Sequence, residues 1–252
     1  MKLAIIIPFY NGHRYLQRCL EGISKIPRDA IFLIDNSDDG QRLQIEAEIV
    51  TTPKSKIGFG AAVNIGLEKI YQQNRFTHVL ILNQDAYFEE GQLQSFLFEC
   101  GLSNDSTHDP IEKFASPMIY RDDRNEAMPF ICSRYFAQGL PTESIDLKDF
   151  VAVALVAPIT LMQSLNGFDE SYYMYYEDND LFARCAMAHP IRIFPQCQVR
   201  HYNPELATGK MSIEKKRWIV TSRLLFLKRH SHFSKWLFES IKHQIKAILG
   251  KD

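Results

Sequence analysis

The feature that most constrains this chain is the alternation, over its first hundred residues, of very short apolar runs with segments of helical periodicity. Runs of four or five apolar residues have the length of strands, and the segments between them repeat apolar residues every three or four positions. The alternation predicts an α/β protein whose mostly parallel central sheet is flanked by helices on both faces. The predicted strands are residues 3–7, ending at Pro8, 31–34 and 79–82, with a weaker one near Ile49; the predicted helices are 13–26 and 60–71.

The rest of the chain is predicted to have longer loops and a helical end. The uncharged stretch from Phe150 to Phe168 holds only about thirteen apolar residues, too few for the roughly 20 that a membrane span needs. The predicted features are surface loops at 103–110 and 121–126, a buried segment at 150–161, a turn at Asn166-Gly167, a helix ending by Ala188, strands at 191–194 and 198–202, and a helical region from Met211.

Composition and charge narrow the class of protein. The 252 residues are 46% hydrophobic and 23% charged, as in globular proteins, and the net charge of −1 gives no basis for nucleic-acid binding. Five cysteines without a C-x-x-C spacing argue against a disulfide framework and favour a reducing compartment. With no recognisable signal peptide, we expect a cytoplasmic protein.

Charge is unevenly distributed along the chain. Residues 210–252 carry eleven Lys/Arg and three Asp/Glu, a net charge of +8, whereas the first 209 residues carry −9. From Lys235 the apolar residues fall on one helical face, which predicts a basic amphipathic helix. Such a helix suits peripheral contact of residues 234–252 with the cytoplasmic face of a membrane, and it equally suits packing on the rest of the chain.

Three acidic clusters are predicted to follow apolar strands directly. They are Asp35, the group Asn83-Gln84-Asp85, and the group from Glu177 to Asp180. Ligands bind at the carboxyl ends of parallel strands, and like charges gathered there repel unless a cation or donor binds among them. Hard oxygen ligands suit Mg²⁺ or Mn²⁺ bridging a carboxylate to the phosphates of a substrate.

Six short segments occur in a fixed order: IIIPFYN from Ile5, LIDNSDDG from Leu33, GFGAAVNIG from Gly58, LNQD from Leu82, GFDE from Gly167 and YYEDNDL from Tyr175. Together they resemble the inverting family-2 glycosyltransferases, which have the GT-A (nucleotide-diphospho-sugar transferase) fold, and within that family the rhamnosyltransferase-like branch. The resemblance, over about residues 1–205, implies a GT-A domain at 1–209 and a helical extension at 210–252. The nucleotide-sugar half would be about 1–100 and the acceptor half about 101–209.

The resemblance also implies roles for particular residues. The donor would be a nucleotide-sugar, dTDP-rhamnose or a UDP-sugar, and the acceptor a glycan or lipid-linked glycan of cell-envelope polysaccharide biosynthesis. Asp85 would bind the Mg²⁺ or Mn²⁺ ion, with His201 as a further ligand, and Asp178 would be the general base. Donor binding would involve Pro8, Tyr10, Asn11, Asp35, Gly60, Asn64, Asn83 and Gln84; acceptor binding would involve Asp169, Glu170 and Glu177.

Several alternatives stay open at the level of sequence. Asn83 stands where the family has the first Asp of a D-x-D motif, which keeps a catalytically idle GT-A-like binding module as an alternative to an enzyme. His201 is equally explained as a structural residue, and the tyrosines between 172 and 176 either line an acceptor groove or belong to the core. Neighbouring carboxylates would raise the pKa of Asp178, whereas a helix beginning there would lower it.

Overall fold

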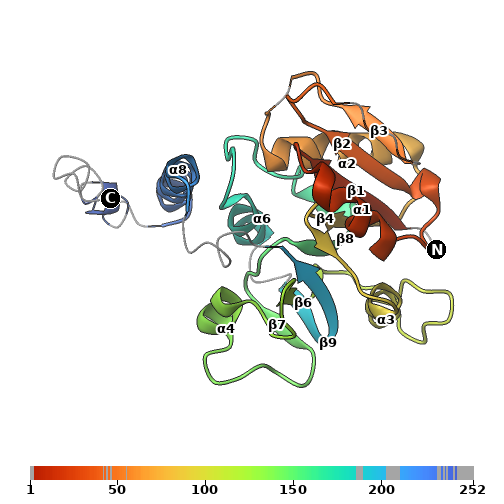
Figure 1. Cartoon of the computed structure of the whole chain (residues 1–252). Helices are drawn as coiled ribbons and strands as arrows, with labels where there is room; N and C mark the ends of the chain where they lie inside the picture. The colour runs from red at the N-terminus through yellow and green to blue at the C-terminus, as the bar shows by residue number, and fades with distance from the viewer. Residues whose placement is uncertain are drawn as a thin grey trace.

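Nine strands form one sheet in the described part of the chain, which comprises residues 3–41, 43, 45, 47–54, 56–185, 190–202, 211–231, 234, 236, 238–240 and 242 of a computed structural model. The strand order is β3-β2-β1-β4-β8-β6-β9-β5, with β7 paired to β9 (Figure 1). The strands are β1 (Leu3–Phe9), β2 (Ile31–Asp35), β3 (Glu48–Thr51), β4 (His78–Leu82), β5 (Ala86–Tyr87), β6 (Ala115–Arg121), β7 (Ile145–Leu147), β8 (Ala154–Pro158) and β9 (Ile191–His201).

The four strands β3-β2-β1-β4 are parallel, as the sequence predicts. From β1 the chain moves outward to β2 and β3 at one edge of the sheet. From β3 it crosses back over β2 and β1 to β4. Right-handed crossovers therefore place α1 (His13–Gly22) and α2 (Phe59–Gln73) on opposite faces. Every residue of β1 and β4 is buried, as expected for apolar strands covered on both sides.

Beyond β4 the sheet is mixed. β8 is antiparallel to β4 and β6, β6 is parallel to β9, and β5 and β7 are antiparallel to β9. Leu82 lies opposite Ala154, so the end of β4 lies beside the start of β8. The remaining helices are a 3₁₀ turn (Arg28–Ala30), α3 (Gln92–Glu99), α4 (Pro129–Tyr135), α5 (Ile159–Ser164), α6 (Glu177–Cys185) and α8 (Ile213–His230).

Two strand boundaries differ from the predictions. Pro8 does not end β1, which continues to Phe9 with Pro8 opposite Ile34. The pairing of β1 with β4 ends at Ile6, so the missing N–H of Pro8 costs no hydrogen bond to β4. The two strands predicted between 191 and 202 are one strand, β9, whose register against β6 shifts between Phe194 and Gln198; this bulge accommodates the residues between them.

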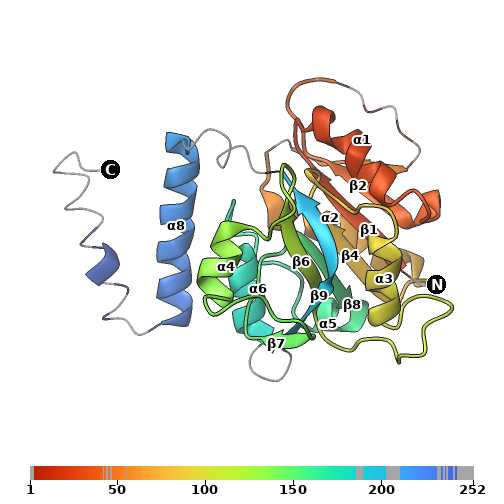
Figure 2. The ribbon, with the colours of Figure 1, turned by 60° about the horizontal axis from the view of Figure 1, so that its bottom comes forward.

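The helical end is confirmed in part. α8 begins after Ser212, whose Oγ accepts a hydrogen bond from the Lys215 N–H at 3.1 Å, and α8 lies beyond α4 and α6 from the sheet (Figures 1 and 2). Among the described helices, none is long and apolar enough to cross a membrane. Residues 186–189 of a predicted helix, and most of the predicted amphipathic helix at 234–252, lie outside the described residues.

Candidate active site

The carboxyl ends of β2, β1 and β4 bring the predicted donor-side residues to one edge of the sheet. These strands are parallel neighbours, so their ends open onto the same edge. Tyr10 and Asn11 follow β1, Asp35 ends β2, and the segment 83–85 follows β4. The structure thus places the first two predicted acidic clusters at the same edge of the sheet.

Gln84 ties the loop after β1 to the loop after β4. Its Oε1 accepts a hydrogen bond from the Tyr10 N–H at 2.9 Å, and its Nε2 donates to the Tyr10 carbonyl at 3.1 Å. Gly12 lies so close that a Cβ there would be 2.4 Å from the Gln84 side chain. Both polar atoms of Gln84 therefore hold the backbone of Tyr10 and shape the loop.

Asp38 lies in the loop after β2 and accepts hydrogen bonds from the loop after β1. Asn11 Nδ2 donates to one carboxylate oxygen at 2.7 Å, and the Tyr10 hydroxyl donates to the other at 3.2 Å. These hydrogen bonds, above all that from Asn11, lower the pKa of Asp38. The carboxylate of Asp35 accepts a hydrogen bond from the Ser37 N–H at 3.1 Å. The sequence predicts no role for Asp38, because its partners lie 27 and 28 residues away in the chain.

Asp85 and His201 form a pair suited to a divalent cation. Ala86 lies opposite His201 in the β5–β9 pairing, and Asp85 Oδ1 is 3.3 Å from His201 Nε2. The second ring nitrogen of His201 and the Asn83 Oδ1 are buried without a hydrogen-bond partner. One carboxylate and one imidazole fit Mn²⁺ or Mg²⁺, which take the rest of their ligands from phosphates and water. Among the described residues, no group of three or more His, Cys, Asp or Glu side chains is arranged so that it could hold a metal ion.

An arginine over two tyrosines whose rings are in contact lies next to this pair. The Tyr202 N–H donates to the Asp85 carbonyl at 3.0 Å, and the Tyr15 and Tyr202 ring centroids are 4.7 Å apart. The Arg14 guanidinium lies 4.4 Å from the Tyr15 centroid and 5.5 Å from that of Tyr202. Arg14 is exposed and has no carboxylate partner in the part of the chain that the structure describes. Sequence reasoning did not identify it.

Asp178 lies in the first turn of α6 and contacts the residues just before β8. Its carboxylate accepts hydrogen bonds from the N–H groups of Asn179 at 2.7 Å and Ala152 at 3.3 Å. Burial raises the pKa of Asp178, against the opposing effect of these two hydrogen bonds. The question that the sequence left open is therefore decided by burial, which it could not reveal.

Asp178, the base candidate, and the Asp85–His201 pair, the cation-site candidate, border the same short backbone segment. Ala152 donates to Asp178, and the carbonyl of the next residue, Val153, accepts a hydrogen bond from the Asn83 N–H at 2.9 Å. Asp85 follows Asn83 by two residues. The two candidates therefore meet at the point where β4 ends and β8 begins.

The third acidic cluster does not follow a strand, contrary to the prediction. The tyrosine-rich segment before it is a loop, with φ near 67° at both Tyr175 and Tyr176, and the cluster forms the first turn of α6. Carboxylates are favourable there because the N-terminus of a helix carries partial positive charge. Tyr172 is 1% exposed and belongs to the core, whereas the neighbouring tyrosines are half-buried.

Glu177 lies beside the base candidate and is buried. Its Oε2 has no hydrogen-bond partner, and burial together with the charge of Asp178 raises the pKa of Glu177 to about 8. A carboxyl with this pKa is mostly protonated at neutral pH.

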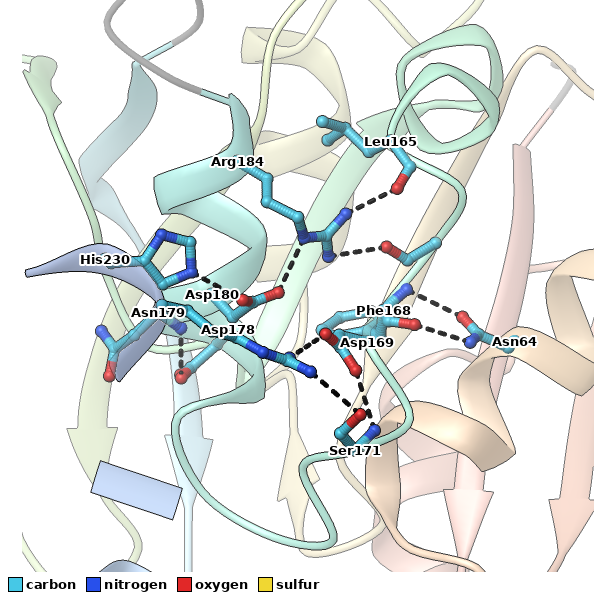
Figure 3. Close-up of polar contacts among 12 residues, drawn as sticks. Asn64, Leu165, Phe168, Asp169, Ser171, Asp178, Asn179, Asp180, Arg184 and His230 are labelled. Atoms are coloured by element: carbon cyan, nitrogen blue, oxygen red, sulfur yellow. Dashed lines mark hydrogen bonds and ion pairs between the residues drawn. The ribbon is translucent and has the colours of Figure 1, made fainter. Parts of the chain in front are cut away.

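The loop that carries Asp169 and Glu170 is held on α2 (Figure 3). Asn64 Nδ2 donates to the Phe168 carbonyl at 2.9 Å and to the Glu170 carboxylate at 3.0 Å, and its Oδ1 accepts from the Phe168 N–H at 2.9 Å. A Cβ at Gly60 would lie 2.9 Å from Phe168. Gly60 and Asn64 therefore contact this loop directly, and Glu170 has a protein partner.

Comparison with known proteins supports the fold. Residues 4–100 match the sequence model of the family described as Glycosyl transferase family 2. The chain is similar in structure to residues 1–349 of S. aureus TarS, with a TM-score of 0.58 and 15% identity over 89% of this chain and 66% of that one. It is also similar to TarS 1–349 in complex with UDP-GlcNAc, with a TM-score of 0.59 and 15% identity over 90% of this chain and 67% of that one. Against GalNAc-T7 with UDP, GalNAc and Mn²⁺, the TM-score is 0.60 at 13% identity over 98% of this chain and 58% of that one.

These similarities establish the GT-A fold. The chain spans 66% of the TarS fragment and 44% of the longer TarS chain. No curated protein sequence is significantly similar to this one.

Proposed function

We propose that this chain is a metal-dependent glycosyltransferase that moves a sugar from a nucleoside-diphosphate donor to a hydroxyl of a glycan or lipid-linked glycan, with inversion. The observation that carries the proposal is the meeting of two groups at the junction of β4 and β8. These are the Asp85–His201 pair, at 3.3 Å, and the half-buried carboxylate of Asp178. The family match over residues 4–100 supports the same reaction class.

The donor lies along the loops after β1, β2 and β4 in this proposal. Tyr10, Asn11 and Asp35 face its base and ribose, and its diphosphate lies toward Asp85. TarS and GalNAc-T7 each have structures with UDP, which favours a uridine nucleotide; a dTDP-sugar, as in the rhamnosyltransferase-like branch, is the second donor to test.

Asp85 and His201 would hold the divalent cation, and the unpartnered Asn83 Oδ1 adds a neutral oxygen nearby. When bound, such an ion neutralises charge on the departing diphosphate. Arg14, exposed beside Tyr202 and without a carboxylate partner among the described residues, supplies a second positive charge for the phosphates.

Asp178 acts as the general base. The acceptor oxygen forms a bond to the anomeric carbon, the bond from that carbon to the phosphate oxygen breaks, and the hydroxyl proton passes to the Asp178 carboxylate. A single displacement of this kind inverts the anomeric carbon. Because burial raises the pKa of Asp178, the carboxylate is a stronger base than an exposed aspartate.

The acceptor side is formed by the loop with Asp169 and Glu170, by Glu177 and by the half-buried tyrosines of residues 173–176. We place the protein in the cytoplasm, with membrane contact through residues 234–252 as the route to a lipid-linked acceptor. The division at 209/210 separates the GT-A domain from this extension.

A thermal-shift panel tests the proposal. Unfolding of the wild type and of Asp85→Asn is followed with UDP, dTDP, GDP and ADP, each with and without Mn²⁺. We expect one nucleotide to raise the Tm of the wild type in a Mn²⁺-dependent way, because a ligand that binds the native state stabilises it. Asp85→Asn should lose the Mn²⁺ dependence.

Release of the nucleoside diphosphate from the matching nucleotide-sugar then separates an enzyme from an idle binding module. Binding without any release, even with a range of glycan acceptors, would favour the idle module. The absence of any nucleotide-dependent shift would contradict both.

A further inference from the structure

The helix α8 packs with one face along the loop that precedes the base candidate. Trp218, Ser222 and Phe226 are spaced four residues apart and therefore share this face. The contacts are those of Trp218 with the Tyr173 ring (centroids 5.0 Å apart), of Ser222 Oγ donating to the Met174 carbonyl (2.8 Å), and of Phe226 with the Tyr176 ring (5.6 Å). The whole loop from 173 to 176 is thus in contact with α8.

The last turn of α8 adds two polar contacts to the same region. Arg229 pairs with Asp169 and donates to Ser171 Oγ at 3.1 Å. His230 Nε2 is 2.7 Å from Asp180 Oδ1 (Figure 3). Both basic side chains lie where the C-terminus of a helix favours positive charge.

Asp180 connects α8 to the base candidate. It is 1% exposed and lies two residues after Asp178 in the first turn of α6. Its other oxygen accepts a hydrogen bond from Arg184 Nε at 2.7 Å, and the guanidinium of Arg184 donates to the carbonyls of Leu165 and Gly167. One buried carboxylate therefore joins α8, α6 and the loop before it.

The loop between these contacts is strained. Tyr175 and Tyr176 both have φ of 67°, a left-handed conformation that is costly for a bulky side chain and persists only where the surroundings hold it. Phe226 packs on Tyr176, and Lys215 lies 5.3 Å from the Tyr175 ring centroid. Two of the residues that contact the strained pair therefore belong to α8, and the Asp180 N–H of α6 donates to the Tyr176 carbonyl at 2.9 Å.

We propose that α8 is a brace that completes the acceptor side of the active site, and that His230 is a positioning residue. Through Asp180, His230 fixes the first turn of α6 and so orients the carboxylate of Asp178. The catalytic part of this inference rests on the proposed function. Because α8 is the first helix of the basic extension, the extension then has a role in the active site of the catalytic domain.

The test compares His230→Ala, His230→Gln and Lys228→Ala in the full-length protein. Lys228 is an exposed residue of the same helical turn and serves as the matched control. Amide hydrogen exchange is measured over residues 169–185 and, for reference, over β1 and β4. The same variants are assayed for release of nucleoside diphosphate from the nucleotide-sugar that stabilises the wild type.

We expect His230→Ala to speed exchange in 169–185 by about tenfold, with β1 and β4 unchanged, because only the local brace is lost. The kcat for release should fall about tenfold while the KM for the donor stays the same. His230→Gln should restore much of both, because its amide can donate to Asp180 from a similar position. Lys228→Ala should behave as wild type.

Unchanged exchange in 169–185 in His230→Ala would overturn the brace. Faster exchange with unchanged kcat would overturn the positioning role. A wild type that binds no nucleoside diphosphate would instead overturn the proposed function, and the exchange data would still decide the brace.

Discussion

The donor side and the acceptor side of this site are built in different ways. On the donor side, residues that directly follow β1, β2 and β4 meet because parallel strands end at one edge. On the acceptor side, Asp178 reaches that edge from a loop and the start of α6, held by side chains of α2 and α8. The first arrangement follows from topology and the second from long-range polar contacts. A substitution should therefore act locally on the donor side, whereas on the acceptor side it should act through the partners that hold the loop.

The substitution with the largest expected effect on turnover also separates the acceptor side from the donor side. Asp178→Asn should reduce turnover by a factor on the order of a hundred or more, because the acceptor hydroxyl loses its base. The affinity for the nucleoside diphosphate should stay near that of the wild type. Turnover is measured by nucleotide release and affinity by calorimetry; wild-type turnover would contradict the base assignment.

Burial on the acceptor side should also appear in the pH dependence of stability. The folded-state pKa of Glu177 is about 8 against an ordinary value of 4.5, so folding favours its protonated form. Between these values the folded chain binds the extra proton, so the stability of the wild type should fall as pH rises from about 4.5 to about 8. Glu177→Gln removes this penalty.

We expect the variant to gain a few kcal/mol relative to the wild type at pH 8 and little at pH 4.5. Denaturant unfolding across this pH range measures the difference. Parallel pH profiles for the two proteins would mean that Glu177 is not held in a raised-pKa environment.

A substitution at Asp85 tests the donor side alone. Asp85→Asn should abolish the Mn²⁺-dependent part of nucleoside-diphosphate affinity, a loss of roughly tenfold, because the amide is a poorer ligand than the carboxylate. Hydrogen exchange in the 169–185 segment should not change. An effect on that segment would show that the two sides are more closely coupled than their construction suggests.

The smallest expected effect is on nucleotide binding, and it should differ between two arginines of α1. Arg14→Gln should weaken nucleoside-diphosphate binding several-fold, with little effect on the monophosphate, because one charged contact to the phosphates is lost. Arg18 also lies over a tyrosine, at 4.0 Å from the Tyr87 centroid, but it is paired with Asp122 at 3.0 Å. Arg18→Gln is therefore the control, and equal effects of the two variants would exclude the proposed role of Arg14.

Much of the fold was predictable because its signals are local. The parallel strands of the first half and the helices between them follow from apolar runs and their spacing, and the predicted strand ends gave Asp35 and Asp85. The mixed pairing beyond β4 had no such signal, since the partner of β4 lies more than 70 residues away at β8. The bulge that joins the two predicted strands into β9 was equally hidden.

The acceptor side shows the same limit at the level of side chains. The spacing of Asp180 and Arg184 is that of a helical i,i+4 pair and could have been recognised from the sequence. The partners Arg229 and His230 could not, because they lie 60 and 50 residues from Asp169 and Asp180. The third acidic cluster was likewise predicted to follow a strand, whereas the loop of Tyr175 and Tyr176 precedes it.

The sequence by itself determined which strands form the nucleotide-side sheet and which polar residues stand at their ends, because both depend on the periodicity of neighbouring residues. Only the tertiary structure decided how Asp178 reaches that sheet, which way its pKa shifts and that α8 packs against the loop before it. Burial and contacts between distant segments arise when the chain folds, and no local pattern encodes them.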